Sequence, residues 1–64
     1  MYFTEAYQAI QAGRRAQRAA WNESVWLILE EGVLFATTGP GFRSRWINDD
    51  LDLATNDWRV SGNL

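Results

Sequence analysis

The sequence predicts a small α+β domain: an N-terminal helix packed on a small antiparallel sheet of about four strands, with a short second helix before the last strand. Three observations indicate this fold class. They are an amphipathic helical pattern at the start of the chain, an apolar hairpin in its middle, and an acidic turn followed by a final apolar strand. A chain of 64 residues is long enough for one domain, which we expect to span residues 1–64.

The first helix is predicted over about residues 4–12. Four apolar side chains recur there at the i, i+3, i+4 and i+7 spacing of one helix face: Phe3, Ala6, Tyr7 and Ile10. Thr4 is expected to cap the start of the helix. Gly13 is expected to end it, because glycine readily adopts the left-handed conformation that follows many helices.

Three strands are predicted to follow this helix. Residues 14–21 form a polar strand, and residues 25–29 and 33–36 form a hairpin. Glu31-Gly32 provides the two-residue turn of the hairpin, in which glycine supplies the positive φ that such turns need.

The end of the chain is predicted to hold the short helix and the closing strand. Residues 37–41, with two glycines and a proline, are expected to form a loop. Asn48 is the expected N-cap of the short helix. Three of its apolar side chains are expected to point partly inward: Leu51, Leu53 and Ala54. Residues 58–60 are predicted to form an edge strand, and residues 61–64 a frayed end.

The predicted hairpin is apolar on both faces, whereas an antiparallel sheet with one wet face should alternate apolar and polar residues. One helix can cover only one of these faces. The chain also has no cysteine and no histidine, so neither disulfides nor the commonest zinc ligands are present to stabilise so small a domain. We therefore expect a homo-oligomer in which a second copy covers the other face.

The composition argues against an enzyme. The chain has no histidine or lysine that could act as a base for a serine nucleophile, so we expect no catalytic residue, no metal and no cofactor. The simplest interpretation of the acidic stretch is a capped helix with solvated carboxylates: Asp49, Asp50, Asp52 and Asp57. A net charge of −2 argues against bulk nucleic-acid binding. No segment is long and apolar enough to span a membrane, which favours a cytoplasmic location.

Four tryptophans are more than so small a core usually needs. Trp58, inside the closing apolar strand, is the first choice for the core. Trp21 stands at a strand end and Trp46 directly follows Arg45, so these two indoles are the better candidates for stacking on a base. Residues 39–41 and the arginines after them form a weaker candidate site, whose amides and guanidinium groups could bind a phosphate.

Several motifs, taken in order, resemble one family. The first half contributes Thr4-Glu5-Ala6, Gly13-Arg14-Arg15, Arg18 and Trp21-Asn22. The second half contributes Arg45-Trp46, eleven intervening residues and Trp58, with Asp52, Leu53 and Asp57 in register. On these motifs the chain resembles the small phage proteins of the second Thoeris anti-defence family over residues 3–60. It departs from the family pattern at Ala20 and Asn48 and has a short loop before Arg43, which could redirect or abolish binding.

The resemblance implies a sponge rather than an enzyme. Members of that family bind cyclic ADP-ribose isomers, and some bind cyclic nucleotides, so that the bacterial immune effector stays inactive. It also implies a homo-oligomer, typically a tetramer, that acts in the host bacterial cytoplasm with its pockets between subunits. The nucleotide-binding residues expected on these grounds are Arg18, Trp21, Asn22, Trp26, Arg45, Trp46 and Asp57.

The resemblance also suggests roles for these residues. Trp21, Asn22 and Trp46 would lie near the base or ribose, and Arg18 or Arg45 near phosphate. Asp57 would either hold a ribose hydroxyl or cap the turn that follows it. The alternative function is a protein-binding inhibitor of a bacterial defence complex, similar to an anti-CRISPR, in which exposed tryptophans and arginines anchor a flat interface.

Overall fold

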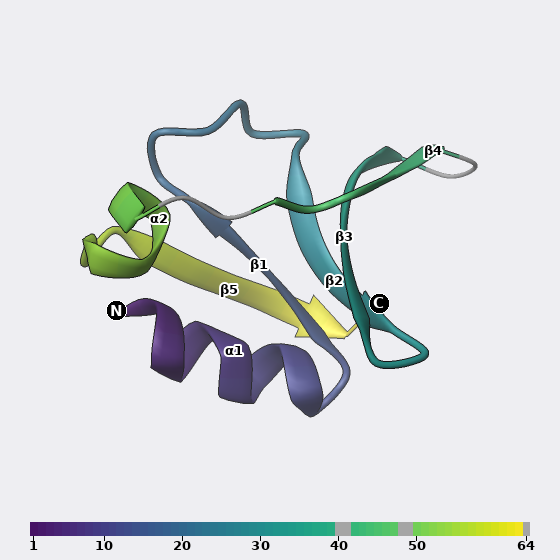
Figure 1. Cartoon of the computed structure of the whole chain (residues 1–64), viewed down its shortest axis with the longest axis horizontal. Helices are drawn as coiled ribbons and strands as arrows, with labels where there is room; N and C mark the ends of the chain where they lie inside the picture. Colours follow the sequence, from purple (N-terminus) through teal and green to yellow (C-terminus); the bar gives the residue numbers. More distant parts are fainter. Residues whose placement is uncertain (40–41, 48–49, 64) are drawn as a thin grey trace.

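The computed structural model describes residues 1–39, 42–47 and 50–63 of the chain. The elements in this part of the chain are α1 (Phe3–Gln11), β1 (Arg14–Arg18), β2 (Trp26–Glu30), β3 (Val33–Gly39), β4 (Phe42–Arg45), α2 (Asp50–Ala54) and β5 (Trp58–Asn63). The strands form one antiparallel sheet in the order β4-β3-β2-β1-β5 (Figure 1). The predicted α+β class is confirmed, although the sheet has five strands rather than about four.

The N-terminal helix α1 lies within one residue of its predicted limits. Its N-cap is Tyr2 rather than Thr4, and the Tyr2 amide donates a hydrogen bond of 3.2 Å to Glu5 Oε1. Gly13 follows the helix with a φ of 91°, as expected of a residue that ends a helix.

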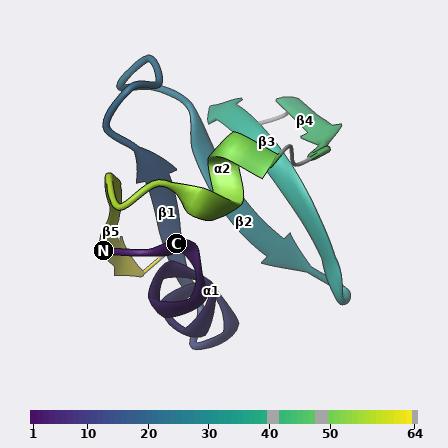
Figure 2. The same cartoon turned by 60° about the vertical axis from the view of Figure 1, so that its left-hand side comes forward.

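One face of the sheet is covered by α1. Ala6 and Ile10 of the helix pack on side chains of three neighbouring strands. The buried cluster on this face consists of Ala6, Ile10, Ala16, Leu27 and Trp58. Figure 2 shows α2 on the same side of the sheet as α1, and the two helices are in contact. Trp58 belongs to this buried cluster and is a core residue, as predicted.

The opposite face of the sheet carries apolar side chains as well. Trp26 and Ile28 alternate with the core residue Leu27 along β2, and Ile28 pairs with Phe35 of β3, so these three share the far face. No helix within the described residues covers them. Ile28 is nonetheless only 3% exposed in the single chain, and Arg15 Cζ lies 4.1 Å from the centroid of the Trp26 ring. Side chains of the chain itself thus shield part of this face.

The strand that the sequence did not reveal is β4. The predicted loop is wrong in part, because β3 continues to Gly39 and residues 42–45 pair with it. Thr37 Oγ1 donates a hydrogen bond of 2.7 Å to the Phe42 carbonyl, which helps to hold the two strands together. Residues 40–41 lie outside the described residues, and with them most of the suggested phosphate-binding turn. All four side chains of β4 are exposed, as expected for an edge strand.

The other strands follow the prediction more closely. The hairpin turn is confirmed, with φ values of 53° at Glu31 and 78° at Gly32. β1 ends at Arg18 rather than at residue 21. β5 is an edge strand, as predicted, but it continues to Asn63 where a frayed end was expected.

The short helix α2 presents a different face from the predicted one. The three apolar residues that were expected to point partly inward are exposed: Leu51, Leu53 and Ala54. The inward residue is Asp52, which is 8% exposed, so the interpretation of this carboxylate as solvated is wrong. The predicted cap Asn48 and its neighbour Asp49 lie outside the described residues. Neither helix of the described chain is long and apolar enough to cross a membrane.

Candidate functional site

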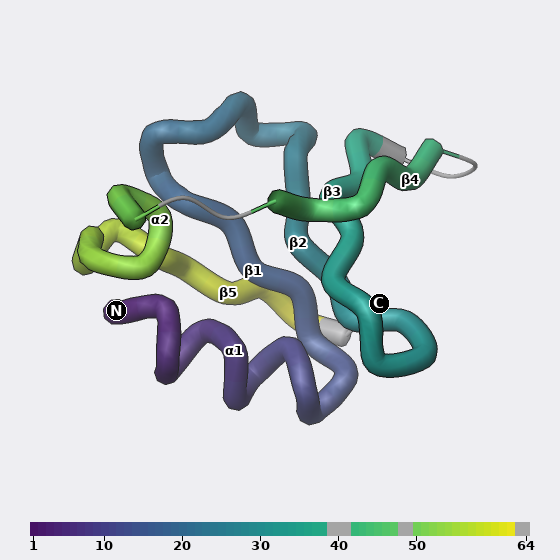
Figure 3. The backbone as a smooth tube through the Cα atoms, in the orientation of Figure 1, coloured from purple at the N-terminus to yellow at the C-terminus, as the bar shows by residue number. Residues whose placement is uncertain are grey.

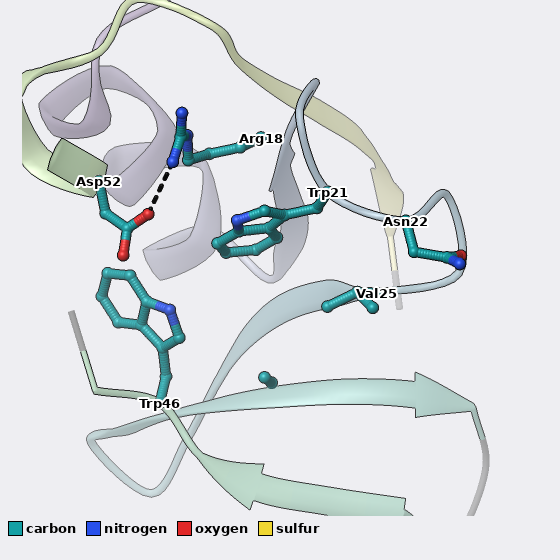
Figure 4. Close-up of a pocket in the computed structure, with 7 residues that line it drawn as sticks. Arg18, Trp21, Asn22, Val25, Trp46 and Asp52 are labelled. Atoms are coloured by element: carbon teal, nitrogen blue, oxygen red, sulfur yellow. Dashed lines mark hydrogen bonds and ion pairs between the residues drawn. The ribbon is translucent and has the colours of Figure 1, made fainter. Parts of the chain in front are cut away.

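A cavity of about 500 Å³ opens on the side of the sheet that carries the helices. It lies between α2 and the long loop of residues 19–25, which Figure 3 follows from β1 into β2. Its lining residues, most of which are labelled in Figure 4, are Arg18, Trp21, Asn22, Val25, Ala36, Trp46 and Asp52. The volume falls within the range of small-molecule pockets in proteins.

Two indole side chains border this cavity, and a third supports both of them from the core. Trp58 meets Trp21 edge to face, with ring centroids 5.2 Å apart, and meets Trp46 edge to face at 6.2 Å. Phe3 of α1 stacks on Trp46 at 5.6 Å, so one face of that indole is already packed. The aromatic walls of the cavity are thus fixed by side chains from α1 and β5.

The loop that carries Trp21 is anchored by a buried glutamine. Gln17 Nε2 donates to the Val25 carbonyl at 2.8 Å and to the Glu23 carbonyl at 3.1 Å, and Gln17 Oε1 accepts from Arg59 Nε at 2.8 Å. Burying this polar side chain is tolerated because its amide is fully engaged. A single residue of β1 therefore holds the end of the loop that leads into β2.

Asn22 tightens the same loop. Its Oδ1 accepts hydrogen bonds from the Ser24 amide at 3.0 Å and from Ser24 Oγ at 2.7 Å. In Figure 4 the amide end of Asn22 points away from the centre of the cavity. Its carbonyl oxygen is committed to the turn, so Asn22 shapes the loop beside the cavity.

The polar end of the cavity is an ion-pair cluster. Arg18 Nη1 donates to Asp52 Oδ1 at 3.0 Å, while Arg18 Nε and Nη2 donate to the two carboxylate oxygens of Asp57 at 3.0 and 3.3 Å. Thr55 Oγ1 also donates to Asp57 Oδ1 at 2.8 Å. Arg18 therefore bridges α2 and the turn before β5, and its side chain is only 11% exposed.

The charges of this cluster shift the ionisation of its members. The hydrogen bond from Arg18, followed by that from Thr55, lowers the pKa of Asp57 from its usual 3.8. The hydrogen bond to Asp57 is also the main reason why the pKa of Arg18 is raised. Both groups therefore stay charged at neutral pH, and the ion pair is intact there.

The structure brings four of the seven candidate residues together around the cavity: Arg18, Trp21, Asn22 and Trp46. Asp57 lies behind Arg18 and holds its guanidinium group. Trp26 is on the far face of the sheet. Arg45 pairs with Phe35 and therefore lies on the far face of the sheet. Trp46 is the next residue in the chain, so the side chains of Arg45 and Trp46 point to opposite sides.

Three lining residues were not among the candidates: Asp52, Val25 and Ala36. Asp52 has the clearest chemical consequence, because it places a carboxylate at the cavity wall. The sequence shows it only as one of several aspartates near a short helix. Its Arg18 partner is 34 positions away, and no local pattern indicates that pairing.

The cavity combines flat aromatic walls with one charged end, which suits a ligand that has both a planar ring and polar substituents. Within the described residues, no group of three or more acidic, histidine or cysteine side chains is placed to hold a metal ion. The chemistry that the arrangement favours is stacking and hydrogen bonding.

Comparison with known proteins supports the resemblance. No curated protein matches the chain. A protein family does match, however: residues 1–61 correspond to the Tad2-like family, described as the Thoeris anti-defense 2-like domain. The match covers both the motifs of the first half and those that end at Trp58, and it supports an anti-defence role. The chain therefore belongs to the Thoeris anti-defense 2-like family.

Proposed function

We propose that this protein binds and sequesters a cyclic nucleotide-type immune signal in the host bacterial cytoplasm, without catalysis. The signal would be a cyclic ADP-ribose isomer or a cyclic oligonucleotide. The observation that carries the proposal is the cavity between Trp21 and Trp46 in a chain of an anti-defence family. Each indole offers a flat surface for a base, and base–aromatic stacking tolerates different bases.

The polar groups around the cavity fit binding better than turnover. Arg18 and Asp52 are paired with each other at 3.0 Å, and Arg18 is further held by Asp57. A sponge needs only affinity, so rigid ion pairs and packed aromatic rings serve it well. Asn22 would support the site indirectly, because its carbonyl oxygen holds the turn at Ser24 and its amide end points away from the centre of the cavity (Figure 4).

We further propose that the protein acts as a homo-oligomer, with the tetramer as the expected form. The far face of the sheet supports this, because Trp26, Phe35 and their neighbours carry apolar surface that no helix of the described chain covers. A small domain also gains stability by burying such a face against another copy. Trp26 and Arg45 would then reach a ligand only if it is bound by a neighbouring copy.

Light scattering coupled to gel filtration tests the assembly. At micromolar concentration we expect a mass of four chains of 7.3 kDa each. The mass of a dimer would be consistent with a covered sheet face but would contradict the tetramer. The mass of a single chain would contradict the homo-oligomer.

A thermal-shift panel tests ligand binding. The purified protein is heated with cyclic ADP-ribose isomers, cyclic dinucleotides and cyclic trinucleotides, with linear ADP-ribose as the matched control. A ligand at 100 times its dissociation constant adds about 2.7 kcal/mol of stability, which raises the midpoint of a domain this small by on the order of 10 °C. A shift with one cyclic class supports the proposal and identifies the signal. A flat response across the panel contradicts it and favours a protein target.

A further inference from the structure

The charged end of the cavity has an electrostatic consequence for what can bind there. Arg18 is the one arginine among the lining residues of the described chain, and it is shared by two carboxylates. Three of the five N–H groups of a guanidinium are engaged in these bonds. Because it combines one positive and two negative groups, the cluster of Arg18, Asp52 and Asp57 carries a net negative charge. This charge repels a phosphate group that approaches Asp52.

No other described arginine compensates for this charge inside the cavity. Arg43 pairs with Glu30 through a contact of 2.6 Å, and Arg45 projects from the far face of the sheet. Arg15 lies over the Trp26 ring, Arg59 donates to Gln17, and Arg14 donates to the Ser61 carbonyl at 3.2 Å. Within one chain, a phosphate in the cavity would thus meet a carboxylate and an arginine whose positive charge is already balanced by two carboxylates.

The carboxylate of Asp52 favours hydrogen-bond donors instead. A carboxylate can accept several hydrogen bonds at once, so a carboxylate that is bonded to Arg18 can also accept from a ligand. Asp52 borders the cavity, and Figure 4 places its carboxylate between Arg18 and the Trp46 indole. A donor on a ring stacked against Trp46 would lie close to this acceptor.

We propose that this cavity is a nucleoside subsite in which Asp52 accepts a hydrogen bond from a sugar hydroxyl or a base N–H group, while the phosphates of the ligand lie outside it. The inference rests on the proposed function and specifies which part of the signal the cavity holds. Arg18 is then a positioning residue that fixes the Asp52 carboxylate rather than a phosphate ligand. Asp57 and Thr55 hold Arg18 from behind.

Titration by NMR tests this subsite with three simple probes: adenosine, 2′,3′-dideoxyadenosine and sodium pyrophosphate. The four indole N–H signals, assigned by single substitutions, report where each probe binds. We expect adenosine to shift the signals of Trp21 and Trp46, and pyrophosphate to leave both unchanged. Pyrophosphate that shifts these two signals at lower concentration than adenosine would overturn the proposal, and this comparison needs only the wild-type chain.

The dideoxy probe identifies the donor. If the sugar hydroxyls bond to Asp52, 2′,3′-dideoxyadenosine binds more weakly than adenosine by about tenfold, as expected for a hydrogen bond to a charged group. Equal affinities exclude the 2′- and 3′-hydroxyls and assign the donor to the base or to the 5′-hydroxyl that both probes carry, provided that both lose affinity in the Asp52→Asn variant. Equal affinities that this variant does not change would overturn the role of Asp52.

Asp52→Asn gives a result that a structural defect would not imitate. We expect the variant to bind adenosine about tenfold more weakly than the wild type. We also expect pyrophosphate, which leaves the wild-type signals unchanged, to begin to shift the Trp21 and Trp46 signals of the variant, because one negative charge has gone. Asp50→Asn, which removes the same charge from an exposed position of the same helix, is the matched control. It should keep the adenosine affinity within twofold of the wild type and remain without a response to pyrophosphate. Weaker binding of adenosine without any response to pyrophosphate in Asp52→Asn would contradict the proposal.

The outcomes separate this inference from the proposed function. Binding of adenosine at Trp21 and Trp46 without binding of any cyclic signal would support the nucleoside subsite but contradict the sponge. Binding of a cyclic signal that pyrophosphate displaces from the same two indoles would support the sponge but contradict the nucleoside subsite.

Discussion

Trp58→Ala is expected to leave the protein largely unfolded at 25 °C. Trp58 is only 2% exposed and contacts the rings of Phe3, Trp21 and Trp46. Truncating such a side chain costs about 3–5 kcal/mol, which is comparable with the whole stability of a domain of this size. Urea denaturation followed by circular dichroism measures the loss, at equal chain concentrations because oligomers gain stability with concentration.

Trp58→Phe is the informative comparison. The smaller ring keeps most of the aromatic packing, but it removes the indole N–H group that donates to the Asp52 carbonyl at 2.8 Å in a buried position. Losing this buried hydrogen bond costs about 0.5–1.5 kcal/mol, so we expect a folded protein with a lower urea midpoint. If the free energy of unfolding of Trp58→Ala were within about 1 kcal/mol of the wild-type value, Trp58 would not support the cavity as described.

Trp46→Leu is expected to weaken binding of the cyclic signal by about 10- to 100-fold, because base–aromatic stacking contributes about 1–3 kcal/mol. Leucine preserves apolar contact with Phe3, which stacks on Trp46, so the fold should survive. Isothermal titration of the signal that the thermal-shift panel identifies measures the change in affinity.

Phe42→Ala provides the matched control for that experiment. Phe42 is another aromatic residue of the same part of the chain, but it is 53% exposed and does not line the cavity. We expect its removal to change the affinity less than twofold. Equal losses in Trp46→Leu and Phe42→Ala would place the ligand outside the cavity between Trp21 and Trp46.

Local patterns in the sequence were enough to predict the first helix, the hairpin and the core position of Trp58. Each of these features depends on residues close together in the chain: the apolar spacing that ends at Gly13, the glycine of the Glu31-Gly32 turn, and the apolar strand around Trp58. The positions of Trp21 and Trp46 in the sequence had already indicated them as stacking candidates, and the family motifs added Arg18 and Asn22. The structure gathers these four residues around one cavity.

The missed features depend on contacts between distant parts of the chain. β4 has the sequence Phe-Arg-Ser-Arg, which lacks an apolar pattern because the strand lies exposed at the sheet edge. Without that strand, the sequence could not show that Arg45 and Trp46 point to opposite faces. Asp52 resembles a solvated helix residue until Arg18 and Trp58 are placed beside it.

Sequestration itself can be measured most directly by depletion and recovery of the signal. The protein is mixed with a smaller molar amount of the cyclic signal, free ligand is separated by ultrafiltration, and the protein fraction is then heat-denatured and analysed by mass spectrometry. We predict that the signal disappears from the filtrate and is recovered after denaturation in full and unmodified. Recovery of a hydrolysed product, or a signal that stays in the filtrate, would contradict a non-catalytic sponge.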